Sequence, residues 1–185
     1  MTTTFSYAGK FSTRSKDTAV THPRHATYDF AVAYPPPEAV PFNGLVEGLK
    51  KGLEREGHDL VYYTERNGNE ALREFTAQKL ANDRGINATP DEVFMTAGSG
   101  EANFVLIKAL SDPGDTVVTE QYVYGGTHNQ LKNHGINVVG SRIDDQGIIP
   151  ESLDELMTDL TAQGKKPKFL YTIPEHQNPT GTTMP

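Results

Sequence analysis

Hydrophobic positions after residue 92 follow two alternating periods, and this alternation predicts the fold class. Short apolar runs that are typical of buried strands are each followed by a segment with apolar residues at helical spacing. The expected strands are 93–96, 116–119, 136–139 and 169–173, and the expected helices are 101–110, 127–133 and 153–160. Short strands that alternate with helices across short turns indicate an α/β fold with a doubly wound, mostly parallel sheet.

Two amphipathic helices and no long strand are predicted before residue 92. The first helix spans about 44–56, with Asn43 as its N-cap and Gly57 as its stop. The second helix spans 69–84 and ends at Gly85. Their apolar side chains each share one face, so both helices are expected to pack against another surface.

The chain begins with a polar segment without a clear period. Residues 1–27 are expected to form a loose N-terminal arm. A short extended piece follows at 28–34, and the three prolines at 35–37 exclude a helix there.

Composition excludes several functional classes. The net charge is −7 and the basic residues are scattered, which argues against binding to nucleic acid or to an anionic membrane. There is no cysteine, and the six histidines have no metal-ligand spacing, so no metal site and no thiol nucleophile are expected. The chain has no apolar run of membrane-spanning length and no signal-peptide pattern, so a cytoplasmic location is predicted.

The turn between the expected strand 93–96 and the next helix is a candidate phosphate site. It reads Gly98-Ser99-Gly100-Glu101. Glycines allow backbone amides to approach an anion, and the first turn of a helix offers unpaired N–H groups at the positive end of its dipole. The same pattern also fits an ordinary tight turn that binds no ligand.

Dinucleotide binding is a second interpretation of this turn. Glu120 lies 20 residues after Gly100, where an acidic residue would meet a ribose hydroxyl. The third glycine of that motif is missing, because Asn103 stands in its place. The dinucleotide interpretation is therefore the weaker one.

Several segments, taken together and in order, resemble the class I/II aminotransferases, which are fold-type I enzymes that use pyridoxal phosphate. They are Tyr-Tyr-Thr-Glu-Arg-Asn-Gly-Asn-Glu-Ala-Leu-Arg at 62–73, Thr-Ala-Gly-Ser-Gly-Glu-Ala at 96–102, Leu-Ser-Asp-Pro-Gly-Asp at 110–115, Glu-Gln-Tyr-Val-Tyr at 120–124, Asp-Gln-Gly-Ile at 145–148 and Asn-Pro-Thr-Gly at 178–181. The resemblance runs from about residue 28 to the end of the chain. It is greatest to the enzymes that act on aromatic, kynurenine or 2-aminoadipate substrates.

The resemblance assigns a role in holding pyridoxal 5′-phosphate to five residues. Ser99 and Gly100 would hold the phosphate, Tyr124 would stack on the pyridine ring, and Asn178 would donate its amide N–H to O3′ of the ring. Tyr63 would reach across a dimer interface to the cofactor phosphate of the neighbouring subunit, which implies a homodimer. Tyr122 takes the place of a proline in the family, which leaves open that it exchanges roles with Tyr124.

The resemblance also implies a domain division and an incomplete active site. Residues 28–57 would form part of the small domain and a linker helix, and residues 58–185 the first part of the large, cofactor-binding domain. In the family the lysine that forms the imine with the cofactor follows Asn-Pro-Thr-Gly, so it is expected beyond Pro185. The chain by itself is therefore expected to be inactive and poorly soluble, with no catalytic residue of its own.

The expected reaction is amino transfer from an amino acid to a 2-oxo acid. The same fold also serves β-lyases, synthases and decarboxylases. It occurs as well in effector-sensing domains of transcription regulators, but the arm at 1–27 is too short and not basic enough for the DNA-binding domain of such a protein.

Arg66 and Arg73 are predicted to lie on solvated helix faces rather than to bind substrate.

Overall fold

The computed structural model describes residues 34–185, together with Ser6, Gly9, Lys10 and Ser12. The arm predicted at 1–27 lies, apart from those four residues, outside the described residues, as does most of the extended piece at 28–34. The chain divides into two compact units, Met1–Arg66 and Asn67–Pro185. The predicted domain division after residue 57 stays a prediction.

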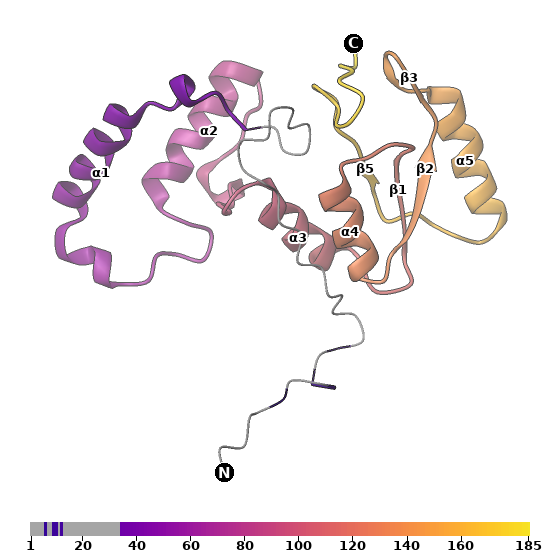
Figure 1. The fold of residues 1–185 in the computed structure, drawn as a ribbon, viewed down its shortest axis with the longest axis horizontal. Helices are drawn as coiled ribbons and strands as arrows, with labels where there is room; N and C mark the ends of the chain where they lie inside the picture. Colours follow the sequence, from indigo (N-terminus) through magenta and orange to yellow (C-terminus); the bar gives the residue numbers. More distant parts are fainter. Residues whose placement is uncertain (1–5, 7–8, 11, 13–33) are drawn as a thin grey trace. The chain divides into compact units, whose positions relative to one another are not determined.

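In the first unit, the described residues form one long helix between two short 3-10 turns. The elements are η1 (Pro37–Ala39), α1 (Phe42–Glu56) and η2 (Gly57–Val61) (Figure 1). The predicted helix is confirmed, but its N-cap is Pro41 rather than Asn43, which lies inside the first turn. The carbonyl of Pro41 already accepts the N–H of Leu45, so the helical hydrogen bonds begin two residues earlier than the side-chain pattern indicates.

Helix α1 has an apolar stripe but buries none of its residues. The side chains of Leu45, Val46, Leu49 and Leu53 are all more than half exposed. An amphipathic helix is stabilised mainly by packing of its apolar face. Within the first unit, this face has no covering element among the described residues.

The second unit is an α/β domain, as predicted. Its elements are α2 (Glu70–Arg84), η3 (Pro90–Glu92), α3 (Ser99–Leu110), β1 (Thr116–Glu120), α4 (Gly125–Asn133), β2 (Asn137–Ser141), β3 (Ile143–Asp144), β4 (Gly147–Ile148), α5 (Pro150–Ala162) and β5 (Leu170–Tyr171). The main sheet has the order β2-β1-β5 and all of its pairs are parallel. A short antiparallel hairpin, β3–β4, follows β2 in the sequence, and the apolar pattern does not predict it.

The strand order explains why helices cover both faces of the sheet. From β1 the chain passes through α4 to β2 on one side, and it then returns through α5 to β5 on the other side of β1. Right-handed crossovers in opposite directions place their helices on opposite faces. Figure 1 shows α4 and α5 on opposite sides of the strands. The doubly wound arrangement is therefore present in the described sheet.

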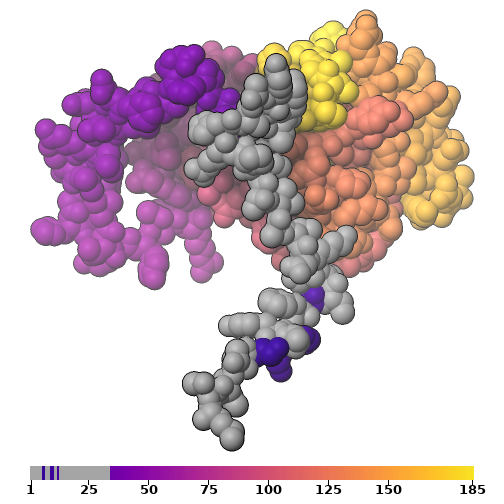
Figure 2. Space-filling view, viewed as in Figure 1, coloured from indigo at the N-terminus to yellow at the C-terminus, as the bar shows by residue number. Residues whose placement is uncertain are grey.

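The core forms where α3 and α4 pack on the central strand. Every residue of β1 is buried, which fits a parallel strand covered on both faces. The buried cluster consists of Ile107, Val117, Leu131 and Ile136, with Val138 and Phe169 packed against it. At the other end of the unit, Met184 lies against Gly147 of β4, and Figure 2 shows the yellow C-terminal segment close to this orange hairpin.

The expected strand at 93–96 is not a strand in the structure. The only backbone hydrogen bond of this segment to a distant described residue joins Met95 N to Asn67 O. A strand exists by pairing with a neighbour, and no other described segment pairs with this one. The predicted secondary structure of this apolar run is therefore wrong.

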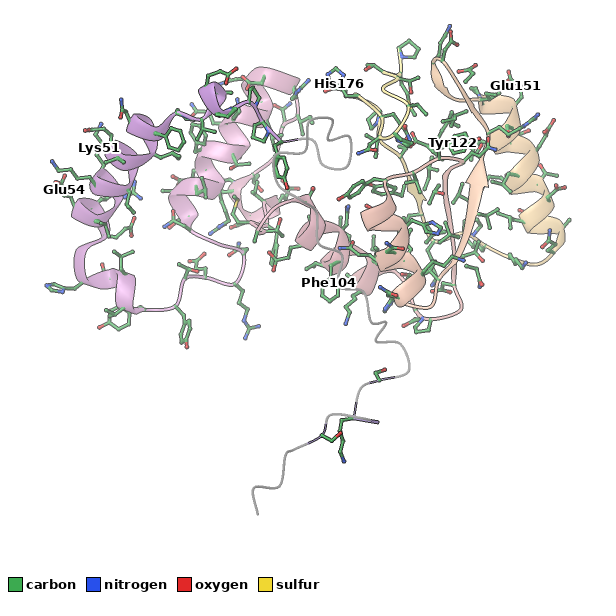
Figure 3. The ribbon with its side chains drawn as sticks, viewed as in Figure 1. Lys51, Glu54, Phe104, Tyr122, Glu151 and His176 are labelled. Carbon is green, nitrogen blue, oxygen red and sulfur yellow. The ribbon has the colours of Figure 1, made fainter. Side chains whose placement is uncertain are left out.

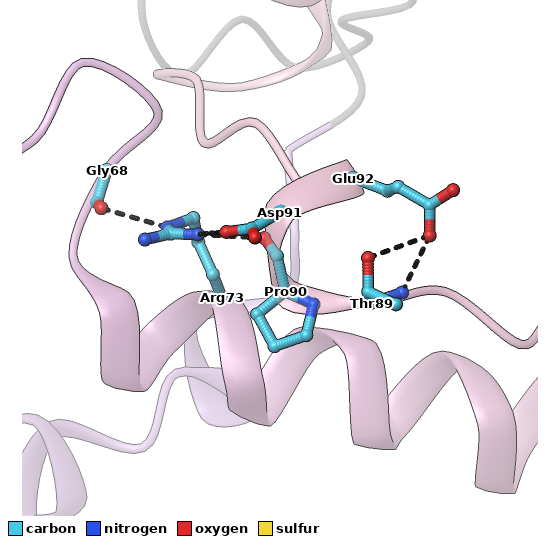
Figure 4. Close-up of polar contacts among 6 residues, drawn as sticks. All are labelled: Gly68, Arg73, Thr89, Pro90, Asp91 and Glu92. Carbon is cyan, nitrogen blue, oxygen red and sulfur yellow. Dashed lines mark hydrogen bonds and ion pairs between the residues drawn. The ribbon is translucent and has the colours of Figure 1, made fainter.

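Arg73 is buried, so its predicted position on a solvated helix face is wrong. Its guanidinium donates from Nε to Gly68 O and from Nη1 to Pro90 O, at 3.1 and 2.9 Å, and it pairs with Asp91 at 3.4 Å (Figure 4). The side chain thus ties α2 to the 3-10 turn η3, in a place where backbone carbonyls replace water as acceptors.

Candidate functional site

A cavity of about 480 Å³ lies at the carboxyl ends of β1 and β5. Four of the predicted site residues line it: Ser99, Gly100, Tyr124 and Asn178. In a parallel sheet all strands end at the same edge, so the loops that follow β1 and β5 meet there. Ser99 and Asn178 therefore face one common cavity, although 79 positions separate them in the numbering (178 minus 99).

The first turn of α3 presents free backbone donors beside this cavity. The first helical bond runs from Ala102 N to Gly98 O, and no hydrogen bond among the described residues uses the N–H of Ser99, Gly100 or Glu101. Gly98 has a φ of +87°, a conformation that side chains rarely tolerate. The turn therefore combines open amides with the positive end of a helix dipole, which is the chemistry of an anion site.

Tyr124 lies at the start of α4 and is half exposed. Its ring lies close to the backbone of Gly126, which also lines the cavity. Tyr122 is exposed and does not line the cavity, and its carbonyl accepts a hydrogen bond from Gln177. The geometry therefore favours Tyr124 over Tyr122 as the ring that faces a ligand.

Asn178 projects from a short loop that follows β5. The loop is closed by two backbone hydrogen bonds, from Gln177 N to Thr182 O at 2.8 Å and from Gly181 N to Gln177 O at 2.6 Å. The bond between Asn178 and Pro179 is cis. His176, labelled with Tyr122 in Figure 3, is exposed on the same loop.

The cavity wall includes polar residues that the sequence does not single out as ligands. Asn103 Nδ2 donates to Thr127 Oγ1, which donates to the Tyr171 hydroxyl, each at 3.1 Å. Gln130 Nε2 donates to Gly100 O at 2.9 Å, while its buried Oε1 has no partner in the described structure. In the sequence, Asn103 is notable only as a mismatch to the dinucleotide pattern. Its hydrogen bond to Thr127 of α4 depends on tertiary packing, so no local sequence pattern predicts it.

Glu120 does not fit the role of a ribose acceptor. It is 1% exposed, and its two oxygens accept from Thr172, Ile173 and Gln177. A carboxylate whose oxygens are already bonded inside the protein is not available to a ribose hydroxyl. The dinucleotide interpretation thus loses the residue on which it depended.

The remaining predicted residues are not among those that line this cavity. Tyr63 belongs to the first unit and is fully exposed. None of the lysines in the described part of the chain lines the cavity. Within the same described part, no cluster of metal-ligating side chains occurs, and no helix has the length and apolar character needed to cross a bilayer.

Among the described residues, two carboxyl groups have a perturbed pKa, and neither lines the cavity. The backbone N–H of Thr89 lowers the pKa of Glu92, and the backbone N–H of Asp112 lowers the pKa of Asp115. Both are local turn interactions that favour the charged carboxylate. Neither carboxyl group contributes to the cavity, whose lining offers neutral polar groups and aromatic rings.

The family comparison and the comparison with individual proteins both identify aminotransferases as similar to this chain. The family model of the class I and II aminotransferases matches residues 37–185. The aromatic-amino-acid aminotransferase 1 of Thermococcus litoralis is 31% identical over 150 residues, which are 81% of this chain and 36% of that protein.

Solved structures agree with the sequence comparison. An archaeal alanine:glyoxylate aminotransferase is 37% identical with a TM-score of 0.77, over 82% of this chain and 37% of that one. The kynurenine aminotransferase of Pyrococcus horikoshii, solved with PMP, KYN and KYA, is 30% identical with a TM-score of 0.72, over 81% of this chain and 37% of that one. The chain thus spans little more than a third of the length of these proteins.

Proposed function

Since this chain belongs to the class I and II aminotransferase family, we propose that its cavity binds pyridoxal 5′-phosphate. The observation that supports this proposal most directly is that Ser99, Gly100, Tyr124 and Asn178 line one cavity although they come from three separate segments. The cavity is also of the size common for small-molecule sites.

Each residue has a part of the cofactor to hold. The free amides of Ser99 and Gly100 would bind the phosphate at the N-terminus of α3, and the Ser99 hydroxyl would add one donor. The Tyr124 ring would stack on the pyridine ring, and the Asn178 amide would donate to O3′. When bound, the cofactor supplies an electron sink for charge that develops on the substrate.

We further propose that the whole protein moves an amino group from an amino acid to a 2-oxo acid. The names of similar proteins include aromatic amino acids and kynurenine, which supports a donor with an aromatic side chain. No lysine of the described residues lines the cavity, so we expect the imine-forming lysine to come from residues outside this chain. The cytoplasmic location stays a prediction.

A homodimer is part of the same proposal. Tyr63 is fully exposed in its unit, and α1 carries an uncovered apolar stripe in the same unit. A second copy of the chain would cover such a stripe and would bring its own Tyr63 to the cofactor phosphate. Sedimentation of wild type and of a Tyr63→Ala variant, with and without cofactor, would test the dimer and the shared site separately.

Binding of pyridoxamine 5′-phosphate to this chain tests the proposed site. This probe is chosen because it lacks the aldehyde that reacts with surface lysines. The decisive variants are Gly100→Asp and Gly100→Asn, since a Cβ at Gly100 meets no atom within 4 Å. An acidic residue stabilises a helix N-terminus but repels a phosphate, so the Asp variant should keep its fold and lose affinity at least about tenfold.

The Asn variant has the same size without the charge, and it should bind within about threefold of wild type. Equal affinities for the two variants would show that the phosphate lies elsewhere. Failure of the wild-type chain to bind the probe, in a titration that also includes NAD, would contradict the proposed cofactor itself.

A further inference from the structure

The side chain of Gln177 uses all of its hydrogen-bonding capacity inside the protein. Its Nε2 donates to Glu120 Oε2 at 2.8 Å and to Tyr122 O at 2.6 Å. Its Oε1 accepts from the N–H and the hydroxyl of Thr180, at 2.9 and 2.7 Å. The residue is 2% exposed, so water does not replace these partners.

Glu120 anchors the side chain of Gln177. It is the last residue of β1, and its Oε1 accepts from Thr172 Oγ1 at 2.7 Å and from Ile173 N at 3.3 Å. None of the ion pairs among the described residues involves Glu120, so neutral donors alone satisfy it. A buried carboxylate held by several donors is a rigid anchor, because any displacement leaves an oxygen without a partner.

Gln177 therefore joins the two loops that carry the ring-binding side chains. On one side it holds the segment 120–122, which leads to Tyr124, and on the other it holds Thr180, which lies two residues after Asn178. Asn178 itself makes no hydrogen bond to another described residue through its side chain. The place of its amide is thus set by its neighbours in the loop.

We propose that Gln177, anchored by Glu120, is a positioning residue that sets the separation between Tyr124 and Asn178 and so the fit of the cofactor ring. This inference rests on the proposed cofactor site. None of the hydrogen-bond partners of the Gln177 side chain lies at the phosphate end of the cavity, at the start of α3. Gln177 should therefore govern binding of the ring and leave binding of the phosphate unchanged.

Because ring binding and phosphate binding are expected to respond differently, two probes test the proposal. Gln177→Leu should weaken binding of pyridoxamine 5′-phosphate about tenfold, which is the scale of one lost hydrogen bond in a well-packed site. Binding of inorganic phosphate, measured by its competition with the probe or by phosphorus NMR, should stay within about twofold of wild type. Circular dichroism would confirm that the variant is folded.

Exchanging the two side chains distinguishes a positioning role from a general loss of structure. Gln177→Glu places a second carboxylate beside Glu120, so it should weaken binding of the probe more than Gln177→Leu does. The double variant Glu120→Gln with Gln177→Glu restores one donor and one acceptor between the two positions. We expect the double variant to recover at least about threefold over Gln177→Glu, with a further deficit because Tyr122 O still lacks its donor.

The outcomes separate this inference from the proposed function. Gly100→Asp should weaken both probes, and Asn178→Ala should weaken only pyridoxamine 5′-phosphate. If those two variants behave so while Gln177→Leu binds like wild type, or loses both probes equally, the positioning role is refuted and the cofactor site stands. If Gly100→Asp and Asn178→Ala bind the probe like wild type, both proposals are refuted together.

Discussion

A Cβ atom placed on Gly126 would collide with Cε1 of the Tyr124 ring, and it would lie 2.9 Å from Cζ of the same ring. Real Cβ atoms do not approach other atoms so closely, so the ring can keep this position only beside glycine. A Cβ atom placed on the neighbouring Gly125 would meet no atom within 4 Å. Two adjacent glycines at the start of α4 thus have different roles, and only one of them determines where the proposed stacking ring lies.

Gly126→Ala should therefore move the Tyr124 ring and weaken binding of pyridoxamine 5′-phosphate. The expected loss is about tenfold, the scale of one aromatic stacking contact. Gly125→Ala is the matched control, since it makes the same change in the same helical turn and gains the same helix propensity. Titration of both variants with the probe tests the prediction, and equal affinities would contradict it.

Arg73 should matter more to stability than its place on a helix suggests. Arg73→Met keeps the apolar stem but removes the donors to Gly68 O and Pro90 O, so unfolding in urea should show a loss of about 1–3 kcal/mol. Arg84→Met is the control, because Arg84 pairs with Glu175 in an exposed position and such pairs contribute about 0–1 kcal/mol. A larger loss in the control would refute the structural role of Arg73.

The turn that ends with Glu92 should give a measurable pH dependence. The Thr89 N–H bonds to the Glu92 carboxylate at 2.8 Å (Figure 4) and lowers its pKa from 4.5. A group whose pKa is lower in the folded state stabilises the fold above its unfolded pKa, and this contribution is lost as the pH falls through the folded pKa. The difference in melting temperature between wild type and Glu92→Gln should thus be small and positive near neutral pH.

The same difference should shrink as the pH falls below 4.5, because the protonated glutamic acid then resembles glutamine. Glu74→Gln, at an exposed position of α2, controls for the loss of one negative charge. A difference that grows on acidification would contradict the assigned direction of the pKa shift.

The sheet is predictable where the signal is local. The apolar run of β1 predicts a strand because a strand that is buried on both faces is apolar at nearly every position. The short apolar run at 136–139 predicts β2 as well, although most residues of β2 are only half-buried or exposed. The run at 93–96 is similarly apolar but has no parallel neighbour among the described residues, and pairing is a property of two segments that one segment cannot reveal. The prediction for Arg73 is wrong for a similar reason, since one of its carbonyl acceptors belongs to Pro90.

The cavity is predictable where residues follow strand ends. Turn chemistry and motif order point to Ser99, Gly100, Tyr124 and Asn178, and the parallel sheet then brings their loops to one edge. Gln177 is adjacent to one of these residues, and yet nothing in the sequence marks it. Its importance comes from Glu120, which is 57 residues earlier in the chain, and no local pattern connects the two.

Residues 1–185 by themselves should bind the cofactor but should not catalyse amino transfer. Transamination needs a lysine amine at the cofactor, and no lysine in the described part of the chain lines the cavity. With pyridoxal 5′-phosphate, an aromatic amino acid and a 2-oxo acid, the rate should not exceed that of free pyridoxal 5′-phosphate, measured by chromatography of the new amino acid. Gly100→Asp is the matched control, because it removes the proposed site without removing any surface lysine. A rate above the free cofactor that disappears in this variant and in one Lys→Ala variant would show that the chain carries a catalytic lysine after all.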